Sequence, residues 1–423
     1  MEKLLLRGAR ILDPSRGMDE TGDLLVCDGK IEKAGGACGE VCVVDASGLV
    51  AAPGLVDLHV HLRDPGFTEK EDVLSGCRAA AAGGVTSLLC MPNTRPALDC
   101  AEAVRGVLKK AEHADAHVYV AAAITKGLSG TEPTDLQSVQ EAGAVAISDD
   151  GKPVVNSALM ARAMRKAVER GLFVTSHCED LSLAAGGKMN EGEVSRALGL
   201  PGIPAAAEDC GTARELALAE AYRLPVHICH VSTKTSVAMI RDAKRRGTPV
   251  TCETAPHYFC LTERELLRRD ADYRMNPPLR TEEDRKAVID GLRDGTIDII
   301  ATDHAPHTPA EKSDFLSAPS GAVGMETSLA AGITYLVKTG VLTLAELIER
   351  MSCAPARLLG IPGGTLACGA PADLVLFDPK ETWTVDPLKL HGKSRNAVLK
   401  GKKLTGRVCA TLLGGKFVYQ KEQ

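Results

Sequence analysis

Eight short apolar runs, separated by helical stretches, fill the middle of the chain and constrain its fold more than any other feature. They lie at 55–61, 85–91, 117–124, 143–148, 172–177, 225–231, 249–254 and 297–302. Their hydrophobicity is nearly continuous, which is typical of parallel strands covered on both faces. Eight such strands, each followed by a helix or a long loop, predict an α/β fold with a (β/α)8 TIM barrel. A doubly wound open sheet is the alternative, but no Gly-x-Gly-x-x-Gly follows a strand.

Two helix starts in this region have a capping-box pattern. Thr68-x-x-Glu71 and Thr281-x-x-Asp284 each place a hydroxyl three residues before a carboxylate, ahead of a helical stretch. In such a box each side chain accepts a hydrogen bond from a backbone N–H at the start of the helix. We therefore expect a helix to begin at each of these two sites.

The two ends of the chain differ from its middle. Residues 2–50 and 365–420 consist of short strand-like runs separated by Gly and Asp turns. Neither segment is large enough for a core of its own, so we expect them to combine in one small β-sandwich. The predicted domains are 1–52 with 360–423 for the sandwich, and 53–359 for the barrel.

Charge and composition exclude several classes of partner. The net charge is −5 and the 14 cysteines form no Cys-x-x-Cys pair. A chain with no excess of positive charge lacks the electrostatic attraction that binds proteins to nucleic acid or to an anionic membrane. No apolar stretch reaches the roughly 20 residues of a membrane span, and the N-terminal apolar run is too short for a signal peptide. We interpret the cysteines as buried reduced thiols and expect a cytoplasmic protein.

The first apolar run carries a His-x-His pair, His59 and His61, followed by Arg63. Residues two apart on a strand point to the same side, so both imidazoles face one point. Together with the arginine they indicate a metal beside a pocket for an anion. A strand with two hydrogen-bonded histidines is the simpler alternative for this segment alone.

The other strands favour the metal interpretation, because polar residues gather where the strands end. The active sites of such barrels lie at the C-terminal ends of the strands. The residues there include Asn93, Asp149, Asp150, His177, His230, His257, Asp303 and His307. Imidazole with carboxylate suits zinc. The spacing suggests His59, His61 and Asp303 on one ion, His177 and His230 on a second, and an aspartate between them.

Four motifs together carry a resemblance to a known family. They are Asp57-Leu-His-Val-His-Leu-Arg-Asp-Pro-Gly66, Met91-Pro-Asn-Thr94, Met275-Asn-Pro-Pro-Leu-Arg280 and Ala301-Thr-Asp-His-Ala-Pro-His307. The chain resembles dihydroorotases of the amidohydrolase superfamily, in particular the longer, bacterial class I type. The similarity extends over nearly the whole chain, to Gly369-Ala-Pro-Ala-Asp-Leu374.

The resemblance implies a set of zinc ligands, with one or two ions per subunit and two favoured. By position they are His59, His61, Asp150, His177, His230 and Asp303. Many superfamily members use a carboxylated lysine as the bridge, but no lysine stands at the end of the fourth strand. Asp150 is the expected bridge instead. Asp149 is the competing candidate, since adjacent residues point to opposite sides.

The resemblance also implies a reaction and a substrate site. Dihydroorotases interconvert N-carbamoyl-L-aspartate and L-dihydroorotate in the de novo synthesis of pyrimidines. A zinc-bound hydroxide is expected to act with Asp303 as the general acid and base. The substrate-binding residues implied are His61, Arg63, Asn93, Asn276, His307, Ser320 and Gly321. The family often has an aromatic residue at position 320, and residues 308–321 are either a mobile closing loop or a plain surface loop.

Two other functions compete with this one. A different cyclic amidase, a hydantoinase or allantoinase, would share the barrel and the metals but would not need Arg63 for its uncharged substrate. An inactive homologue that serves as a scaffold for aspartate transcarbamoylase would lack the ligands found here. A homodimer is expected, and aspartate transcarbamoylase is a possible partner.

Overall fold

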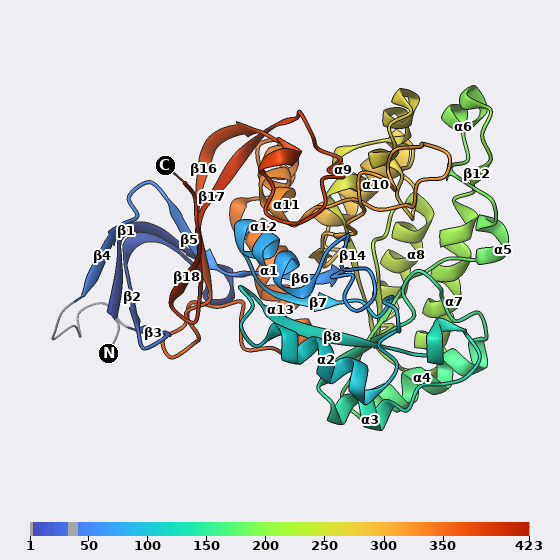
Figure 1. Ribbon diagram of the computed structural model, residues 1–423, viewed down its shortest axis with the longest axis horizontal. Coiled ribbons are helices and arrows are strands. Elements are labelled where there is room, and N and C mark those ends of the chain that lie inside the picture. Colours follow the sequence, from blue (N-terminus) through green and yellow to red (C-terminus); the bar gives the residue numbers. More distant parts are fainter. Residues whose placement is uncertain (1–2, 33–40, 423) are drawn as a thin grey trace.

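A computed structural model describes residues 3–32 and 41–422, and its largest part is an α/β barrel (Figure 1). Eight parallel strands form one sheet in the order β15-β14-β13-β10-β9-β8-β7-β6. Their bounds are β6 Leu55–Val60, β7 Val85–Cys90, β8 His117–Ala123, β9 Ala144–Ser148, β10 Phe173–Ser176, β13 Val226–Ile228, β14 Val250–Thr254 and β15 Ile299–Ile300. The predicted barrel is therefore confirmed.

The barrel is nearly closed between its first and last strands. Val60 at the end of β6 forms a parallel bridge with His304, which follows β15. The N–H of His61 donates to the carbonyl of His304 over 2.8 Å. This contact brings the His-x-His pair of the first strand beside Asp303 of the last, although 242 positions separate His61 from Asp303.

Helices surround this sheet. The main ones are α1 Val73–Ala82, α2 Ala101–Ala111, α3 Leu136–Glu141, α4 Ser157–Glu169, α7 Ala206–Tyr222, α8 Lys234–Arg245, α10 Glu282–Arg293 and α11 Met325–Gly332. Smaller elements lie in the connections, namely α5 Leu181–Ala184, β11 Met189–Asn190, α6 Glu193–Leu198, β12 Gly202–Ile203, α9 Pro256–Cys260, α12 Leu344–Ile348 and α13 Ala354–Leu359. Of these, α12 and α13 follow the last barrel strand and precede the C-terminal strands.

One of the two predicted helix starts is correct. Thr281 caps α10 and forms the expected box with Asp284. The prediction at Thr68 is wrong, because α1 begins five residues later, where Asp72 and Ser75 form the box. Glu71 is buried and accepts hydrogen bonds from the Ser75 hydroxyl and the Lys393 backbone N–H instead.

Strands from both ends of the chain share a second sheet, as predicted. Its order is β18-β17-β16-β5-β1-β2-β3, with β4 paired to β1. The bounds are β1 Lys3–Asp13, β2 Met18–Cys27, β3 Lys30–Glu32, β4 Cys42–Asp45, β5 Val50–Pro53, β16 Leu374–Thr384, β17 Lys403–Leu413 and β18 Lys416–Gln420. Leu6, Ile11, Leu374 and Leu412 belong to one buried apolar cluster of this unit. The exact boundaries at 52/53 and 359/360 stay a prediction.

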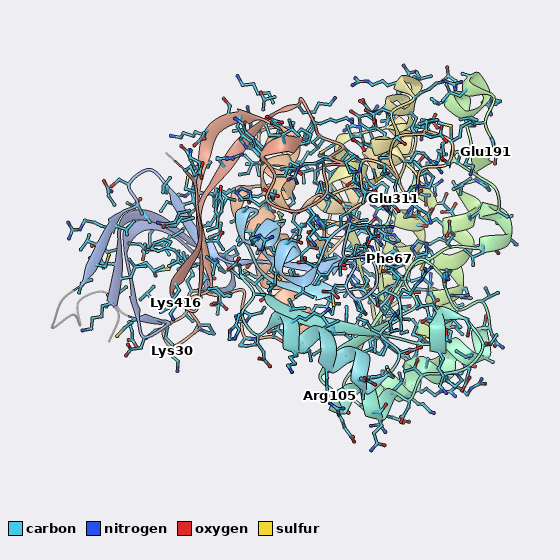
Figure 2. All side chains as sticks on the ribbon, in the orientation of Figure 1. Lys30, Phe67, Arg105, Glu191, Glu311 and Lys416 are labelled. Atoms are coloured by element: carbon cyan, nitrogen blue, oxygen red, sulfur yellow. The ribbon has the colours of Figure 1, made fainter. Side chains whose placement is uncertain are left out.

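Charged side chains project from the outer surface of both parts. Lys30 and Lys416 mark the terminal sheet, and Arg105 and Glu191 mark the helical shell of the barrel (Figure 2). No helix among residues 3–32 and 41–422 is long and apolar enough to cross a membrane. The described cysteines are free thiols; Cys90, Cys229 and Cys252 are buried as expected, whereas Cys100 and Cys210 are exposed.

Candidate metal centre and substrate pocket

A polar pocket of about 230 Å³ lies at the C-terminal ends of the barrel strands. It is lined by His61, Arg63, Asn93, Asp150, Gly151, His177, His230, Asn276, Asp303, Ala305, His307, Ser320 and Gly321. The structure thus brings every predicted substrate-binding residue to one pocket. Among the predicted metal ligands, only His59 is not part of its lining, and that side chain is fully buried.

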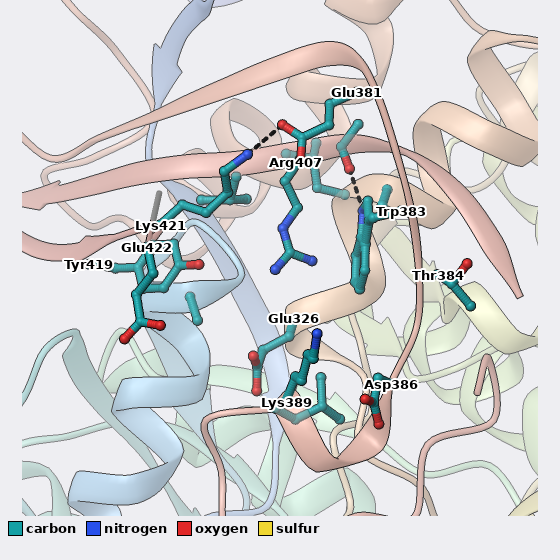
Figure 3. Close-up of a pocket in the computed structure, with 16 residues that line it drawn as sticks. Glu326, Glu381, Trp383, Thr384, Asp386, Lys389, Arg407, Tyr419, Lys421 and Glu422 are labelled. Carbon is teal, nitrogen blue, oxygen red and sulfur yellow. Dashed lines mark hydrogen bonds and ion pairs between the residues drawn. The ribbon is translucent and has the colours of Figure 1, made fainter. Parts of the chain in front are cut away.

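A larger pocket of about 500 Å³ lies elsewhere, between α11 and the strands β16 to β18 (Figure 3). Its wall includes Trp383, on which the Arg407 guanidinium stacks at 4.0 Å. Lys421 and Glu381 form an ion pair across its edge at 2.6 Å. It contains neither a histidine cluster nor an excess of one charge, so we place the chemistry in the smaller pocket.

Two groups of candidate metal ligands share Asp150. One comprises His59, His61 and Asp150, and the other comprises Asp150, His177 and His230; in each group the ligand atoms lie within 4.8 Å of one another. Oδ1 of Asp150 lies 3.2 Å from Nε2 of His59 and 3.7 Å from Nδ1 of His177. A carboxylate shared by two pairs of imidazoles suits two neighbouring cations.

Asp303 lies beside the first of these groups. Its Oδ1 is 3.1 Å from Nε2 of His61 and 3.8 Å from Nε2 of His59. It also lines the pocket, so its carboxylate faces both the imidazoles and the space for a substrate.

Unpartnered buried atoms test whether a metal fits this cluster. Nε2 of His59 and Oδ1 of Asp150 are buried and have no hydrogen-bond partner. Buried polar atoms without partners are costly, and coordination of a cation is one way to satisfy them. Imidazole nitrogen with carboxylate oxygen, and no thiolate at this position, is a donor set that zinc accepts. The residues present therefore fit a metal centre.

Asp149 and Asp150 point to opposite sides of their strand end. Oδ1 of Asp149 accepts hydrogen bonds from the backbone N–H groups of Ile124 and Thr125 at 2.7 and 3.1 Å. Burial raises the pKa of this Asp149 carboxyl to about 6, although the hydrogen bonds from Thr125 oppose the shift. Asp149 thus ties β9 to the segment after β8, and only Asp150 faces the histidines.

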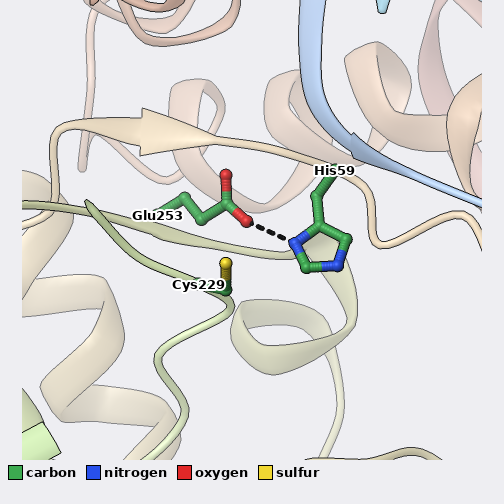
Figure 4. A group of neighbouring side chains, drawn as sticks. All are labelled: His59, Cys229 and Glu253. Carbon is green, nitrogen blue, oxygen red and sulfur yellow. Dashed lines mark hydrogen bonds and ion pairs between the residues drawn. The ribbon is translucent and has the colours of Figure 1, made fainter. Parts of the chain in front are cut away.

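A buried glutamate that the sequence reasoning missed lies behind His59 (Figure 4). Oε1 of Glu253 is 2.9 Å from Nδ1 of His59, and Oε2 is 3.1 Å from Nε2 of His227. Burial disfavours the charged form of Glu253, but hydrogen bonds from His227 and His59 outweigh it and lower its pKa to about 2. A charged residue inside the apolar run of β14 was the signal that could have revealed it.

The same neighbourhood contains a third group of possible ligands, formed by His59, Cys229 and Glu253. Burial raises the pKa of the Cys229 thiol to about 11, and its sulfur lies 2.7 Å from the hydroxyl of Thr175. A protonated thiol is a poor ligand. Glu253 already accepts the proton on Nδ1 of His59. We therefore interpret this group as one that holds the His59 ring in place, and not as a third metal site.

The predicted anion site surrounds Arg63. Its Nε donates to the carbonyl of Pro306 over 3.1 Å, and its Nη2 lies 3.3 Å from Nε2 of His307. None of the described residues forms an ion pair with it. Burial lowers the pKa of Arg63 to about 10, so the guanidinium stays charged at neutral pH. Burial and the neighbouring cation Arg63 lower the pKa of His307 to about 3, which leaves that imidazole neutral.

Asn93 contacts candidate ligands as well as lining the pocket. Its Oδ1 lies 2.8 Å from Nδ1 of His61, and its Nδ2 donates to Oδ2 of Asp150 over 3.2 Å. Both atoms of the amide are thus engaged. The second N–H of Nδ2 is the part that remains for a substrate.

Ser320 and Gly321 form one wall of the pocket. The carbonyl of Ser320 lies 2.9 Å from Nε2 of His307. The N–H of Gly321 donates to the carbonyl of Arg274 over 2.8 Å, and its carbonyl accepts from Nδ2 of Asn396 over 3.0 Å. Because both backbone groups of Gly321 have partners, its contribution is the shape of the wall.

Hydrogen bonds hold the loop 308–321 in place at several points. The ammonium of Lys312 donates to the carbonyls of Ala271 and Pro319 at 3.0 and 2.8 Å. Nη1 of Arg274 donates to the carbonyl of Phe315 over 2.9 Å. Movement of this loop over a substrate stays a prediction.

Three residues of the site have left-handed backbone conformations. The φ angles of Arg63, His230 and Asp303 are 60°, 35° and 49°. Such values are uncommon for residues other than glycine and are often found at functional sites. Each residue follows the end of a barrel strand, where the turn directs its side chain toward the pocket.

Known proteins resemble this chain along its whole length. The dihydroorotase of Geobacter metallireducens is 51% identical over 423 residues, which cover 99% of this chain and 100% of that protein. That of Syntrophus aciditrophicus is 48% identical, with 99% and 100% covered. The chain belongs to the dihydroorotase family. Residues 48–236 also match the family model described as dihydro-orotase-like.

The fold is shared with related cyclic amidases. The L-hydantoinase of Arthrobacter aurescens superposes with a TM-score of 0.89 at 26% identity, covering 100% of this chain and 97% of that one. A D-hydantoinase structure superposes with a TM-score of 0.86 at 26% identity, covering 99% and 95%. Membership of the dihydroorotase family makes the chain a metal-dependent cyclic amide hydrolase with a buried His and Asp metal site.

Proposed function

We propose that this dihydroorotase interconverts L-dihydroorotate and N-carbamoyl-L-aspartate in the pocket, with two zinc ions shared by Asp150. His59, His61 and Asp303 would hold one ion, and His177 and His230 the other. Bound zinc lowers the pKa of a water molecule to about 7 and polarises a carbonyl oxygen. The unpartnered atoms of His59 and Asp150 support this assignment.

Arg63 is the observation that carries the choice of substrate. Its charged guanidinium lines the pocket that also contains Asp303, and it has no carboxylate partner among the described residues. A planar guanidinium binds a carboxylate with two parallel hydrogen bonds. Dihydroorotate has one carboxylate beside its ring, whereas hydantoin and allantoin have none. The single positive charge therefore favours dihydroorotate over both.

Asp303 is proposed to move the proton. In the hydrolytic direction it accepts a proton from the attacking water and delivers it to the ring nitrogen as the amide bond breaks. In the cyclising direction the same carboxylate removes a proton from the attacking nitrogen. Its contact with His61 at 3.1 Å holds it at the edge of the pocket.

The remaining polar residues would position the substrate. Asn93 and His307 line the pocket together with Arg63 and would contact the same carboxylate, and Asn276 would contact the ring. Ser320 and Gly321 would close the side of the site beside His307. His61 would contact the substrate as well as an ion.

Turnover of dihydroorotate, hydantoin and allantoin by the zinc-loaded protein tests the proposal. We expect hydrolysis of dihydroorotate, loss of activity on chelation, and recovery on addition of zinc. Preference for hydantoin or allantoin would overturn the assignment. A protein that neither binds zinc nor processes any of the three would instead support the scaffold alternative.

The remaining predictions concern assembly and location. A homodimer is expected and can be checked by light scattering of the purified chain. Association with aspartate transcarbamoylase can be checked by co-purification. Cytoplasmic location stays a prediction.

A further inference from the structure

Glu179 connects the candidate metal centre with the substrate pocket. Its Oε2 lies 3.2 Å from Nε2 of His177 and also accepts a hydrogen bond from Nδ2 of Asn276 over 3.2 Å. The other ring nitrogen of His177, Nδ1, faces Asp150. Glu179 is itself 9% exposed, so few water molecules can compete for its oxygen.

This contact fixes the orientation of the Asn276 amide. A carboxylate only accepts hydrogen bonds, so the atom facing it must be the amide nitrogen. The reversed amide would place two acceptors 3.2 Å apart. Asn276 lines the pocket, and its Oδ1 is buried without a hydrogen-bond partner. The oxygen left over is therefore an acceptor that lacks a donor.

We propose that Glu179 is a positioning residue that holds the Asn276 amide with its oxygen available to the ligand, so that the pocket selects a ring N–H. The inference rests on the proposed function, because dihydroorotate carries two ring N–H groups. A site that offers a fixed acceptor discriminates strongly against a ligand that lacks the donor.

Binding of orotate tests this inference without turnover. Orotate is the planar relative of dihydroorotate and keeps both the carboxylate and the two ring N–H groups. Calorimetry would compare it with 1-methylorotate and 3-methylorotate on the zinc-loaded protein. We expect one of the two methyl derivatives to bind at least roughly tenfold more weakly than orotate, because its N–H is gone. The methyl derivative that binds more weakly identifies the ring nitrogen that faces Asn276.

Glu179→Gln should reduce that discrimination to about twofold or less, since a glutamine side chain can donate to Asn276 and allow its amide to turn. The matched control is Glu263→Gln. Glu263 accepts a hydrogen bond from Nδ2 of Asn190 over 2.7 Å, but neither residue lines the pocket. Discrimination should stay at the wild-type level in this control.

Zinc content is measured for each protein, because Glu179 also contacts His177. If Glu179→Gln loses zinc, the Asn276→Leu variant provides the test. It removes the acceptor oxygen of Asn276 and leaves the contact between Glu179 and His177 unchanged. Unchanged discrimination in Asn276→Leu, or in zinc-loaded Glu179→Gln, overturns the inference. Wild-type protein that hydrolyses dihydroorotate but binds all three orotates equally also overturns it. Wild-type protein that neither hydrolyses dihydroorotate nor binds orotate removes the proposed function and the inference together.

Discussion

Oε1 of Glu253 lies 2.9 Å from Nδ1 of His59, deep inside the barrel. The bond places a proton on Nδ1 of His59, and the other ring nitrogen, Nε2, faces Asp150 at 3.2 Å. The second oxygen of Glu253 contacts His227, which in turn contacts the hydroxyl of Thr251 at 2.8 Å. Residues from two neighbouring strands, β13 and β14, thus hold one candidate ligand on β6 in place.

Glu253→Gln is expected to weaken zinc binding by roughly 10- to 100-fold, as is typical when the partner of a ligating histidine is lost. Competition with a chromophoric chelator measures the affinity. Asp13→Asn is the control, because it makes the same kind of change at a buried carboxylate of the terminal sheet that accepts from Leu366 N–H at 2.7 Å. Equal zinc affinity in Glu253→Gln and wild type would argue against a positioning role.

The strands and their polar ends could be predicted from the sequence because burial of a parallel sheet on both faces leaves continuous apolar runs. What could not be predicted depends on side-chain direction. Asp149 and Asp150 have the same chemistry, and only the position of Thr125 decides that Asp149 turns away. The contacts of Glu253 with His59 and of Glu179 with Asn276 could not be predicted, because they join segments 194 and 97 positions apart. The predicted helix start at Thr68 was wrong because Glu71 contacts Lys393, 322 positions away, and does not cap a helix.

Arg63→Gln should raise KM for dihydroorotate by roughly 10- to 100-fold, since charge-assisted hydrogen bonds contribute about 1.5–3 kcal/mol. The effect on kcat should be smaller, and zinc content should not change, because Arg63 contacts Pro306 and His307 and none of the candidate ligands. Steady-state kinetics and metal analysis check both points. Arg105→Gln on the exposed face of α2 serves as the control. An unchanged KM in Arg63→Gln would refute the anion site.

Gly321→Ala should destabilise the pocket wall. Gly321 has φ 129°, and an added Cβ would lie 2.6 Å from Cβ of Ala305. Strain of this kind typically costs about 1–3 kcal/mol, and the displaced wall should also raise KM. Gly401→Ala is the comparison, because its φ is 71° but nothing lies within 4 Å of the added carbon. Thermal unfolding and kinetics should separate the two variants; equal behaviour would contradict the crowding at Gly321.

His391 and Glu326 should make stability depend on pH. Their side chains lie 2.7 Å apart, and the hydrogen bond to Glu326 raises the pKa of His391 above its usual 6.5. The extra stabilisation is therefore complete below pH 6.5 and is lost as pH rises through the folded-state value. Since the pair is partly exposed, it amounts to about 0.5 kcal/mol.

Urea unfolding of His391→Gln at about pH 5.5 and about pH 8.5 checks this sign. The variant should lose more stability, relative to wild type, at the lower pH. Glu326→Gln should remove the same dependence. A larger loss at the higher pH would show that the ion pair does not stabilise the fold.

The central claim is that Asp150 joins two zinc sites at the mouth of the barrel. Anomalous diffraction at the zinc edge, from crystals of the zinc-loaded protein, tests it most directly. We expect two peaks beside the Asp150 carboxylate, one next to His59 and His61 and the other next to His177 and His230. A map with no peak there, or with a single peak that leaves one pair of histidines without an ion, would contradict it.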